Sequence, residues 1–235
     1  MSNYLLFATK NGLVKKTPLG EYENIRSSGL IAVKLDEGDS LLSVKETSGN
    51  DKVILVTAGG KAIRFTEKDI RPTGRATRGV RGIKLGKDDE VVGMDTIENS
   101  KPKTQNSKLN LLVVTENGYG KMTPVEEYSQ QVRGGKGVFT AKVTEKTGKI
   151  VDMRLVELMS KETEELKNQR TKEQNQKTRQ PENQLTDLLI ISAQGQVIRL
   201  PLSSVPTLGR QTQGVHLINL SPGDTVAALA LLENG

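Results

Sequence analysis

The chain has 235 residues, with 34 Lys and Arg against 28 Asp and Glu, so its formal net charge is +6 and its sequence pI is near 9.4. It contains no cysteine, which excludes a disulfide framework and a thiolate metal site and is compatible with a cytoplasmic location. No apolar run approaches the about 18 residues of a membrane span, and the basic excess makes polyanions the first partner class to consider.

The first predicted element is a β-hairpin over residues 4–17. In YLLFATKNGLVKKT, an apolar run is followed by a turn that ends at Gly12 and by a more polar returning run. Glycine suits the positive φ that such a turn requires. Because only three residues precede Tyr4, we expect the chain to be a fragment of a longer protein.

Two further strands are predicted after this hairpin. Gly29 precedes the apolar run LIAVKL, and the short turn EGD leads to a last apolar run, LLSV. Residues 4–49 therefore form one unit of four short strands, which we call a blade.

The same order of runs, turns and glycines occurs three more times. The predicted blades cover residues 4–49, 52–98, 109–157 and 187–235. The later hairpin turns end at Gly60, Gly118 and Gly195, and the later counterparts of Gly29 are Gly79, Gly137 and Gly214. Self-similarity at about 45 residues predicts an all-β, propeller-like array of four four-stranded antiparallel blades.

Residues 158–186 interrupt this pattern. The segment is rich in Gln, Asn, Lys and Glu and has few apolar residues. Because it cannot bury enough apolar surface to offset the entropy of ordering, we expect a disordered polar insert between the third and fourth blades.

Cations recur at matched offsets in the repeats, in the returning strand of each hairpin and around the second glycine. They are Lys15, Lys16, Arg26, Lys34, Arg64, Arg75, Arg78, Arg81, Lys84, Lys121, Lys142, Arg199 and Arg210. Alternation along a strand turns Lys34, Lys84 and Lys142 away from their apolar neighbours. A blade array would merge such rows into a belt that binds the phosphates of duplex DNA without reading sequence.

The segment QQVRGGKG, residues 130–137, concentrates this chemistry. Gly134, Gly135 and Gly137 lack a Cβ atom and would let the backbone approach a phosphate closely. Arg133 can place two N–H groups on phosphate oxygens, and Lys136 adds a point charge. We expect all five residues to bind DNA.

Catalytic machinery is not indicated by the sequence. No Walker loop and no paired carboxylate or metal-ligand pattern is present, so no cofactor is expected. We interpret Tyr4, Tyr22, Tyr119 and Tyr128 as packing residues, and His216 lies in a predicted strand. The alternative to DNA binding is a β-propeller scaffold that binds protein partners.

Several of these segments carry a family resemblance. NGLVKKTPLGEY, GVRGIKLGKDDEVVGM, TENGYGKMTPVEEY and GRQTQGV resemble the C-terminal domain of the gyrase A protein and its topoisomerase IV relative, whose fold is a β-pinwheel. QQVRGGKG resembles the gyrase-A box at Gln131, Arg133, Gly134, Gly135, Lys136 and Gly137, although Val132 stands where the box has a cation.

The resemblance, to DNA gyrase, implies a module that binds and wraps duplex DNA in support of supercoiling. It implies that the tyrosine for DNA cleavage lies in another domain, so this fragment is not an enzyme by itself. The expected partners are duplex DNA, the gyrase B protein and the rest of the gyrase A protein, with the fragment itself monomeric. Topoisomerase IV stays open as the alternative parent enzyme.

Overall fold

The computed structural model describes residues 3–24, 27–98, 107–159 and 186–233. Within these ranges the chain is built from β-strands and short 3-10 helices. The helices are η1 (Leu19–Tyr22), η2 (Glu67–Asp69), η3 (Val125–Glu127) and η4 (Leu202–Ser204). No helix in the described ranges is long and apolar enough to cross a membrane.

The strands form four antiparallel sheets, named here by their order along the chain. Sheet 1 has the order β3-β1-β2-β6, from β3 (Leu41–Thr47), β1 (Tyr4–Thr9), β2 (Leu13–Pro18) and β6 (Val80–Arg81). Sheet 2 has the order β10-β5-β4-β7, from β10 (Val138–Phe139), β5 (Lys61–Thr66), β4 (Lys52–Thr57) and β7 (Val91–Ile97). Sheet 3 has the order β11-β8-β9-β14, from β11 (Ile150–Met159), β8 (Ser107–Thr115), β9 (Tyr119–Pro124) and β14 (Val215–His216). Sheet 4 has the order β13-β12-β15, from β13 (Val197–Pro201), β12 (Thr186–Ser192) and β15 (Val226–Glu233).

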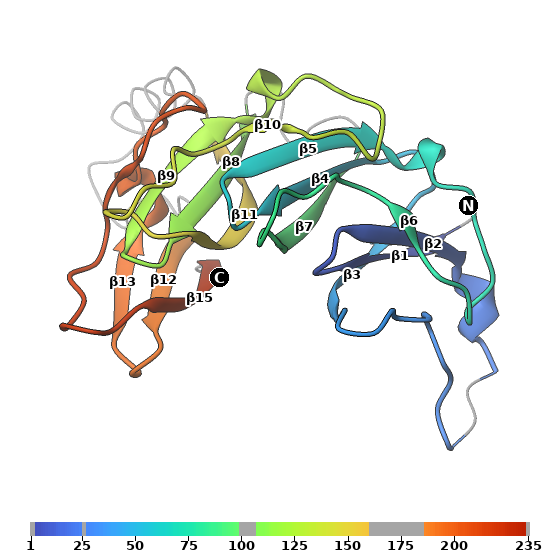
Figure 1. Cartoon of the computed structure of the whole chain (residues 1–235). Coiled ribbons are helices and arrows are strands. Elements are labelled where there is room, and N and C mark those ends of the chain that lie inside the picture. The colour runs from blue at the N-terminus through green and yellow to red at the C-terminus, as the bar shows by residue number, and fades with distance from the viewer. Residues whose placement is uncertain (1–2, 25–26, 99–106, 160–185, 234–235) are drawn as a thin grey trace, which may run out of the picture.

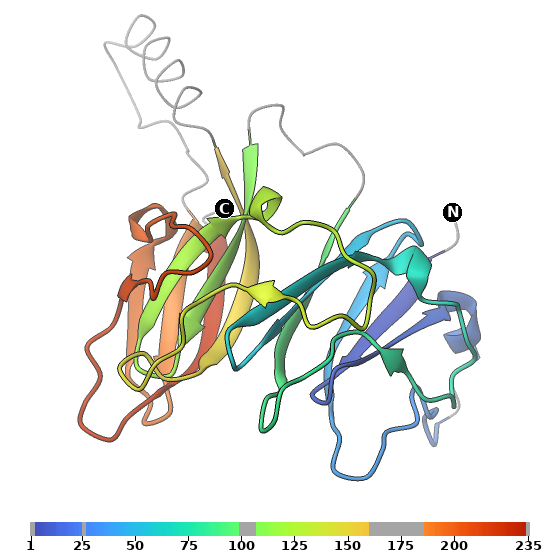
Figure 2. The ribbon, with the colours of Figure 1, turned by 45° about the horizontal axis from the view of Figure 1, so that its top comes forward.

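The four sheets follow one another along an arch, with sheets 1 and 4 at opposite ends (Figure 1). Successive sheets meet through the strands β3, β7, β11 and β15. A second view shows the same succession from the N-terminal to the C-terminal end (Figure 2). The predicted all-β class with four successive blades is confirmed.

The prediction that each repeat supplies all four strands of its own blade is wrong, because the fourth strand comes from the next repeat. β6 lies in the second repeat but pairs with β2 of the first, with Leu13 opposite Arg81 and Val14 opposite Val80. In the same way, β10 of the third repeat pairs with β5, and β14 of the fourth pairs with β9. Each of the first three sheets is thus completed by the following repeat, whereas sheet 4 has three strands in the described part of the chain.

The third run of each repeat is also shorter than predicted. Only two residues of each of the three later runs are paired, because the backbone then turns to bond the preceding hairpin, as in Gly82 N to Gly12 O at 2.8 Å. The first run, LIAVKL at 30–35, is not part of a strand. All four predicted hairpins are present, as β1 with β2, β4 with β5, β8 with β9 and β12 with β13.

The ends of the predicted insert also differ from the prediction. Residues 158 and 159 complete β11, and residue 186 begins β12. The rest of the predicted insert, 160–185, lies outside the described residues.

The hydrophobic core lies between neighbouring sheets. Leu6 of sheet 1 and Leu55 of sheet 2 belong to one buried cluster, and two further clusters continue the core towards sheet 4. Tyr128 is fully buried in this core, and its hydroxyl shares a 2.5 Å hydrogen bond with Oγ1 of Thr140. Burying a large apolar side chain contributes roughly 1.5 to 3 kcal/mol, so these interfaces hold the arch together.

Candidate nucleic-acid interface

Three loops that precede the exchanged strands carry cations and no acidic residue. They are 71–79, 129–137 and 206–214, with three, two and one Lys or Arg, respectively. Each loop crosses the returning strand of the preceding hairpin, as loop 129–137 does over β5 (Figure 2). The corresponding segment of the first repeat, 21–29, contains Glu21 and Glu23 beside a single arginine.

Repeated backbone hydrogen bonds hold the three loops in the same way. One bond joins a loop N–H to the returning strand: Thr73 N to Lys16 O at 2.9 Å, Gln131 N to Arg64 O at 2.8 Å and Leu208 N to Met122 O at 2.8 Å. A second bond joins the loop carbonyl to the preceding repeat: Lys34 N to Thr77 O at 3.1 Å, Lys84 N to Gly135 O at 2.8 Å and Lys142 N to Thr212 O at 3.1 Å. The loops therefore present equivalent positions in equivalent orientations along the arch.

The second set of backbone bonds also holds the main chain of three lysines against the loops. Lys34, Lys84 and Lys142 are exposed, as the alternation of the sequence predicts. Their neighbours Ile83 and Ala141 are each only 2% exposed. The backbone thus places an ammonium group beside each of the three loops.

In loop 129–137, the side chain of Arg133 serves the protein itself. Its Nε donates to Asp69 O at 2.8 Å, and one terminal nitrogen donates to Arg81 O at 3.0 Å. These bonds pin the loop onto the second repeat and leave the other terminal nitrogen for a ligand. Lys136 is exposed.

Two of the three glycines of this loop have structural roles that the sequence did not predict. A Cβ atom on Gly137 would lie 2.5 Å from Ala62 O, so this glycine allows β10 to dock on β5. Gly134 has φ +80°, and its N–H donates to Gly82 O at 2.6 Å. Gly135 accepts the Lys84 bond and has room for a Cβ atom, with its nearest neighbour at 3.4 Å. Packing accounts for Gly137 and backbone conformation for Gly134, but neither requires a glycine at position 135, and the phosphate contacts of the three glycines stay a prediction.

Three of the predicted DNA contacts are buried, which corrects their assignment to the outer surface. Lys15, Lys16 and Lys121 are 2%, 4% and 0% exposed. β2 and β9 are covered by the exchanged strand and its loop, so their cations face protein rather than solvent.

Lys121 shows what these buried cations do. Its Nζ donates to the carbonyl oxygens of Gly209 and Arg210, at 2.5 and 2.8 Å, in the loop of the following repeat. Burial lowers the pKa of Lys121 to about 8, although Glu127 opposes the shift. The ammonium group thus finds its hydrogen-bond acceptors in the backbone of this loop, which offsets part of the cost of burying the charge.

Lys15 makes the same connection at the junction of the first and second repeats. Its Nζ donates to the carbonyl oxygens of Ala32 and Arg75. Lys16 donates to Glu67 O at 2.9 Å and lies 3.8 Å from the carboxylate of the same residue. Burial lowers the pKa of both lysines, with Glu21 opposing the shift at Lys15 and Glu67 opposing it at Lys16.

The predicted arginines divide into paired and less engaged side chains. Arg64 donates to Val125 O at 3.1 Å, and burial lowers its pKa against the opposing charge of Glu126. Three arginines lie beside carboxylates: Arg78 at 2.6 Å from Asp36, Arg199 at 2.5 Å from Asp187 and Arg210 at 4.0 Å from Glu127. Arg75 is half-buried, Arg81 is exposed, and Arg26 lies outside the described residues.

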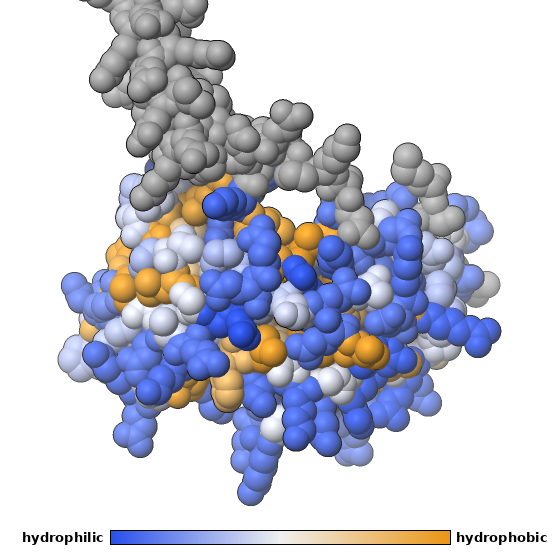
Figure 3. Space-filling model, turned by 90° about the horizontal axis from the view of Figure 1, so that it is seen from above, coloured by the Kyte–Doolittle hydropathy of each residue, from blue (hydrophilic) through white to orange (hydrophobic). Residues whose placement is uncertain are grey.

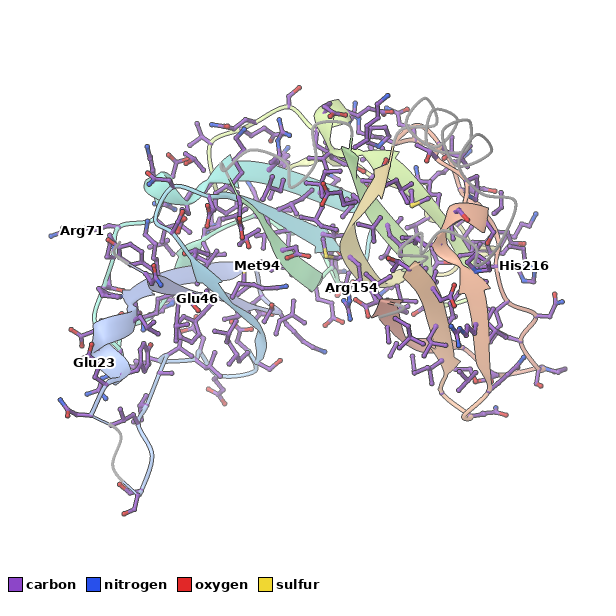
Figure 4. The ribbon with its side chains drawn as sticks, turned by 180° about the vertical axis from the view of Figure 1, so that it is seen from behind. Glu23, Glu46, Arg71, Met94, Arg154 and His216 are labelled. Atoms are coloured by element: carbon purple, nitrogen blue, oxygen red, sulfur yellow. The ribbon has the colours of Figure 1, made fainter. Side chains whose placement is uncertain are left out.

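Two further cations belong to this surface and were missed from the sequence. Arg71 opens the first loop and projects away from the arch (Figure 4). Lys61 lies with Nζ 5.4 Å from the ring centroid of Phe139, which is 52% exposed beside loop 129–137. Their positions in the sequence could have identified both residues. Arg71 begins a loop that has no acidic residue, and Lys61 directly follows the turn glycine Gly60.

The face seen from above the arch is mainly hydrophilic, with smaller apolar areas between the polar side chains (Figure 3). The described residues contain no group of three or more His, Cys, Asp or Glu side chains that could hold a metal ion. What this surface offers is ammonium and guanidinium groups on rigid loops, which suits phosphate oxygens.

Residues 3–48, 51–98, 109–157 and 186–233 match the family model described as DNA gyrase C-terminal domain, beta-propeller. Over 228 residues, 97% of this chain, the sequence is 39% identical to the DNA gyrase A protein of Staphylococcus epidermidis and covers 22% of that protein. It is 38% identical to the DNA gyrase A protein of Mycolicibacterium smegmatis over 229 residues, 97% of this chain and 23% of that protein. The chain thus spans about a fifth of the length of these curated relatives.

Two solved structures share the fold. The C-terminal domain of DNA topoisomerase IV matches with a TM-score of 0.80 and 20% identity, over 99% of this chain and 62% of that one. The DNA gyrase A C-terminal domain matches with a TM-score of 0.75 and 24% identity, over 98% of this chain and 66% of that one. The predicted pinwheel architecture agrees with both.

Proposed function

The chain belongs to the DNA gyrase C-terminal domain family, and from this premise we propose that it is the duplex-DNA-binding module of a DNA gyrase A protein. The observation that carries the proposal is the repeated loop. Equivalent backbone bonds hold three loops without acidic residues in one orientation, each beside an exposed lysine. The two gyrase A relatives support gyrase rather than topoisomerase IV as the parent enzyme.

The proposed contacts are the cations of this surface that are accessible. They are Lys34, Lys61, Arg71, Arg75, Arg81, Lys84, Lys136 and Lys142. Arg78, Arg133 and Arg210 would take a secondary part, because each already bonds a protein carboxylate or carbonyl. Charges of this kind bind phosphates and carry no direct information about base sequence.

The curved arrangement supports a role in bending DNA. Smooth bending of a 20 to 30 base-pair site by 40 to 90° costs on the order of 1 to 6 kcal/mol, which several phosphate contacts would offset. A duplex that follows successive loops would be wrapped in support of supercoiling. The cleavage chemistry would lie elsewhere in the gyrase A protein, and the gyrase B protein would complete the enzyme in the cytoplasm.

Salt dependence tests the proposed contacts. Each phosphate neutralised contributes about −0.9 to the slope of log affinity against log salt, so the eight proposed contacts predict a slope of about −7 if all bind at once. Lys136→Ala and Lys84→Ala should each weaken duplex binding and reduce the magnitude of the slope by about 1. Fluorescence anisotropy with two duplexes of unrelated sequence, from 50 to 200 mM salt, measures both the slope and the expected indifference to sequence.

Lys45→Ala is the matched control, because Lys45 is equally a lysine on the arch but lies on the strand β3 and pairs with Asp95 at 3.0 Å. Its slope should equal that of the unmodified protein. Weak DNA binding that does not respond to salt, or equal slopes in all variants, would exclude the proposed interface and favour a protein-binding scaffold.

A further inference from the structure

The inner strands of the arch lie opposite the proposed DNA-binding loops. In each of the first three sheets, β3, β7 or β11 forms one edge and the exchanged strand forms the other. The loops that lead into the exchanged strands lie on the convex side of the arch (Figure 1). The inner strands line the concave side, where Met94 and Arg154 are found (Figure 4). A bond between inner strands therefore joins neighbouring sheets at a distance from the proposed DNA contacts.

Neighbouring sheets are incompletely packed on this concave side. A hollow of about 480 Å³ lies between β3, β7 and β11, and charged side chains from all three strands line it: Lys45, Asp95, Asp152 and Arg154. Apolar clusters hold the sheets together, but the hydrophobic effect is non-directional and does not by itself fix the angle between two sheets. Hydrogen bonds are directional, so those that cross the hollow can fix that angle.

Asp95 makes bonds of this kind to two neighbouring sheets. It lies on β7 of sheet 2, and its side chain is 17% exposed. One carboxylate oxygen lies 3.0 Å from Lys45 Nζ of sheet 1, and the other accepts a hydrogen bond of 3.3 Å from Leu155 N of sheet 3. A single carboxylate thus connects three consecutive sheets.

Asp152 makes the corresponding connection from sheet 3 to sheet 4. It lies on β11, and one carboxylate oxygen accepts a hydrogen bond of 3.2 Å from Leu229 N of β15. Arg154, which pairs with the other oxygen, donates to Leu229 O at 3.2 Å. Burial raises the pKa of Asp152, although Arg154 and the backbone N–H groups of Met153 and Leu229 oppose the shift. The carboxylate is thus buried together with the groups that compensate its charge.

Both carboxylates bind N–H groups at the edge of a sheet. β11 and β15 are edge strands of sheets 3 and 4 in the described part of the chain. An outward N–H group of an edge strand has no partner in its own sheet. Asp95 and Asp152 supply that partner for Leu155 and Leu229 from the preceding sheet.

A bound duplex would load these bonds in tension. DNA is stiff, with a persistence length of about 150 base pairs, so a duplex bent over the convex side pushes back towards a straight path. Flattening an arch lengthens its concave side, so the inner strands of neighbouring sheets would have to separate. The bonds of Asp95 and Asp152 oppose that separation.

We propose that Asp95 and Asp152 are positioning residues that fix the curvature of the arch and thereby set how far a bound duplex is bent. The inference rests on the proposed DNA binding and wrapping, and it adds the groups that hold their geometry. Removing a hydrogen bond to a charged group should shift the balance between the curved and a flattened junction by about tenfold or more towards the flattened form. The phosphate contacts on the convex side stay intact.

Ligation of nicked circular DNA on the 235-residue chain tests the proposal, because the change in linking number reports the bending of the bound duplex. At saturating protein, a chain with both Asp95→Ala and Asp152→Ala should give a smaller change per bound chain than the unmodified protein, and each single variant should lie between them. Fluorescence anisotropy with a short duplex should show unchanged affinity and an unchanged salt slope in all variants. Unfolding would instead weaken binding and wrapping together.

Two further variants separate curvature from charge. Asp95→Asn retains an oxygen for Leu155 N, so it should keep most of the change in linking number that Asp95→Ala loses. Glu46→Ala is the matched control, because Glu46 is an exposed carboxylate on β3 whose hydrogen bond of 2.7 Å comes from Asn3 of its own repeat. It removes the same charge as Asp95→Ala and should wrap DNA like the unmodified protein.

An equal change in linking number for the double variant and the unmodified protein would overturn the inference and leave the proposed wrapping in place. A parallel loss of affinity and linking number would also overturn it, because the two carboxylates would then stabilise the fold as a whole. If the unmodified protein binds duplex DNA but does not change the linking number, the proposed wrapping fails, and this inference fails with it. An absence of duplex binding would overturn the proposed function itself.

Discussion

Lys121 shows how a buried cation can support the proposed DNA-binding surface without contacting DNA itself. It is fully buried, and its Nζ holds the carbonyl oxygens of Gly209 and Arg210 in the loop of the next repeat. Lys15 makes the equivalent bond to Arg75 O. Lys15 and Lys121 are therefore positioning residues, because they hold the backbone of Arg75 and of Arg210 on their loops.

The lowered pKa of Lys121 has a consequence for stability. Its folded value is about 8 against an ordinary 10.5, so the unfolded chain binds more protons between these pH values. Stability from this group therefore rises with pH from about 8 to 10.5. Relative to Lys121→Met, the unmodified protein should gain about 1 to 3 kcal/mol over this range, at roughly 1.4 kcal/mol per pKa unit as an upper bound.

Urea unfolding of both proteins at pH 7.5, 9 and 10.5 measures this gain, and the other lysines cancel in the difference. A pH-independent difference would mean that the buried amine keeps an ordinary pKa.

Strand exchange makes each short donor strand depend on one glycine. Gly137 has φ +67°, and a Cβ atom added to it would lie 2.5 Å from Ala62 O. Gly29 has φ +75°, but a Cβ atom added to it would meet nothing within 4 Å. Gly29→Ala should cost about 1 to 2 kcal/mol through the left-handed conformation alone. Gly137→Ala should cost roughly 1 to 3 kcal/mol more, because the backbones of β10 and β5 must separate.

Chemical denaturation of the two variants at low protein concentration gives both values. If Gly137→Ala proved no more destabilising than Gly29→Ala, the close contact between β10 and β5 would not be limiting. Proton exchange of the β5 amides should also increase in Gly137→Ala and stay unchanged in Gly29→Ala.

The sequence predicted elements whose signal is local. Apolar runs separated by glycine turns identified all four hairpins, and the last apolar run of each repeat corresponds to β3, β7, β11 or β15. The sequence could not predict which hairpin the third run of a repeat would join. A run such as VRGIKL has the same apolar pattern whether it pairs with the hairpin of its own repeat or with that of the preceding one. Lys15 and Lys16 were misplaced for a related reason. Two adjacent cations are typical of an exposed strand end, and both are buried here because the second repeat supplies acceptors, from Arg75 to Lys15 and from Glu67 to Lys16.

At the scale of the molecule, the cations of the loops lie along an arch, and a duplex that binds several of them at once must bend. Nicked circular DNA closed by ligase in the presence of the protein should therefore change its linking number, increasingly so as protein is added. Agarose gels with an intercalator measure the distribution. A chain with Lys84→Ala, Lys136→Ala and Lys142→Ala should leave the linking number close to that of free DNA.

An unchanged distribution, under conditions where anisotropy shows saturated binding, would mean that the duplex stays straight on the protein. Binding would then be local to one or two loops. The proposal of wrapping would be excluded while that of DNA binding stood.

The exchange of strands also sets an order for biosynthesis. Val80 and Arg81 complete the first sheet but follow the first hairpin by more than 60 residues, so they leave the ribosome well after it. Each of the first three nascent sheets thus waits with an unsatisfied edge until its successor is translated. Pauses in translation between repeats would prolong that exposure, so codon choice at these boundaries bears on the yield of correctly assembled protein.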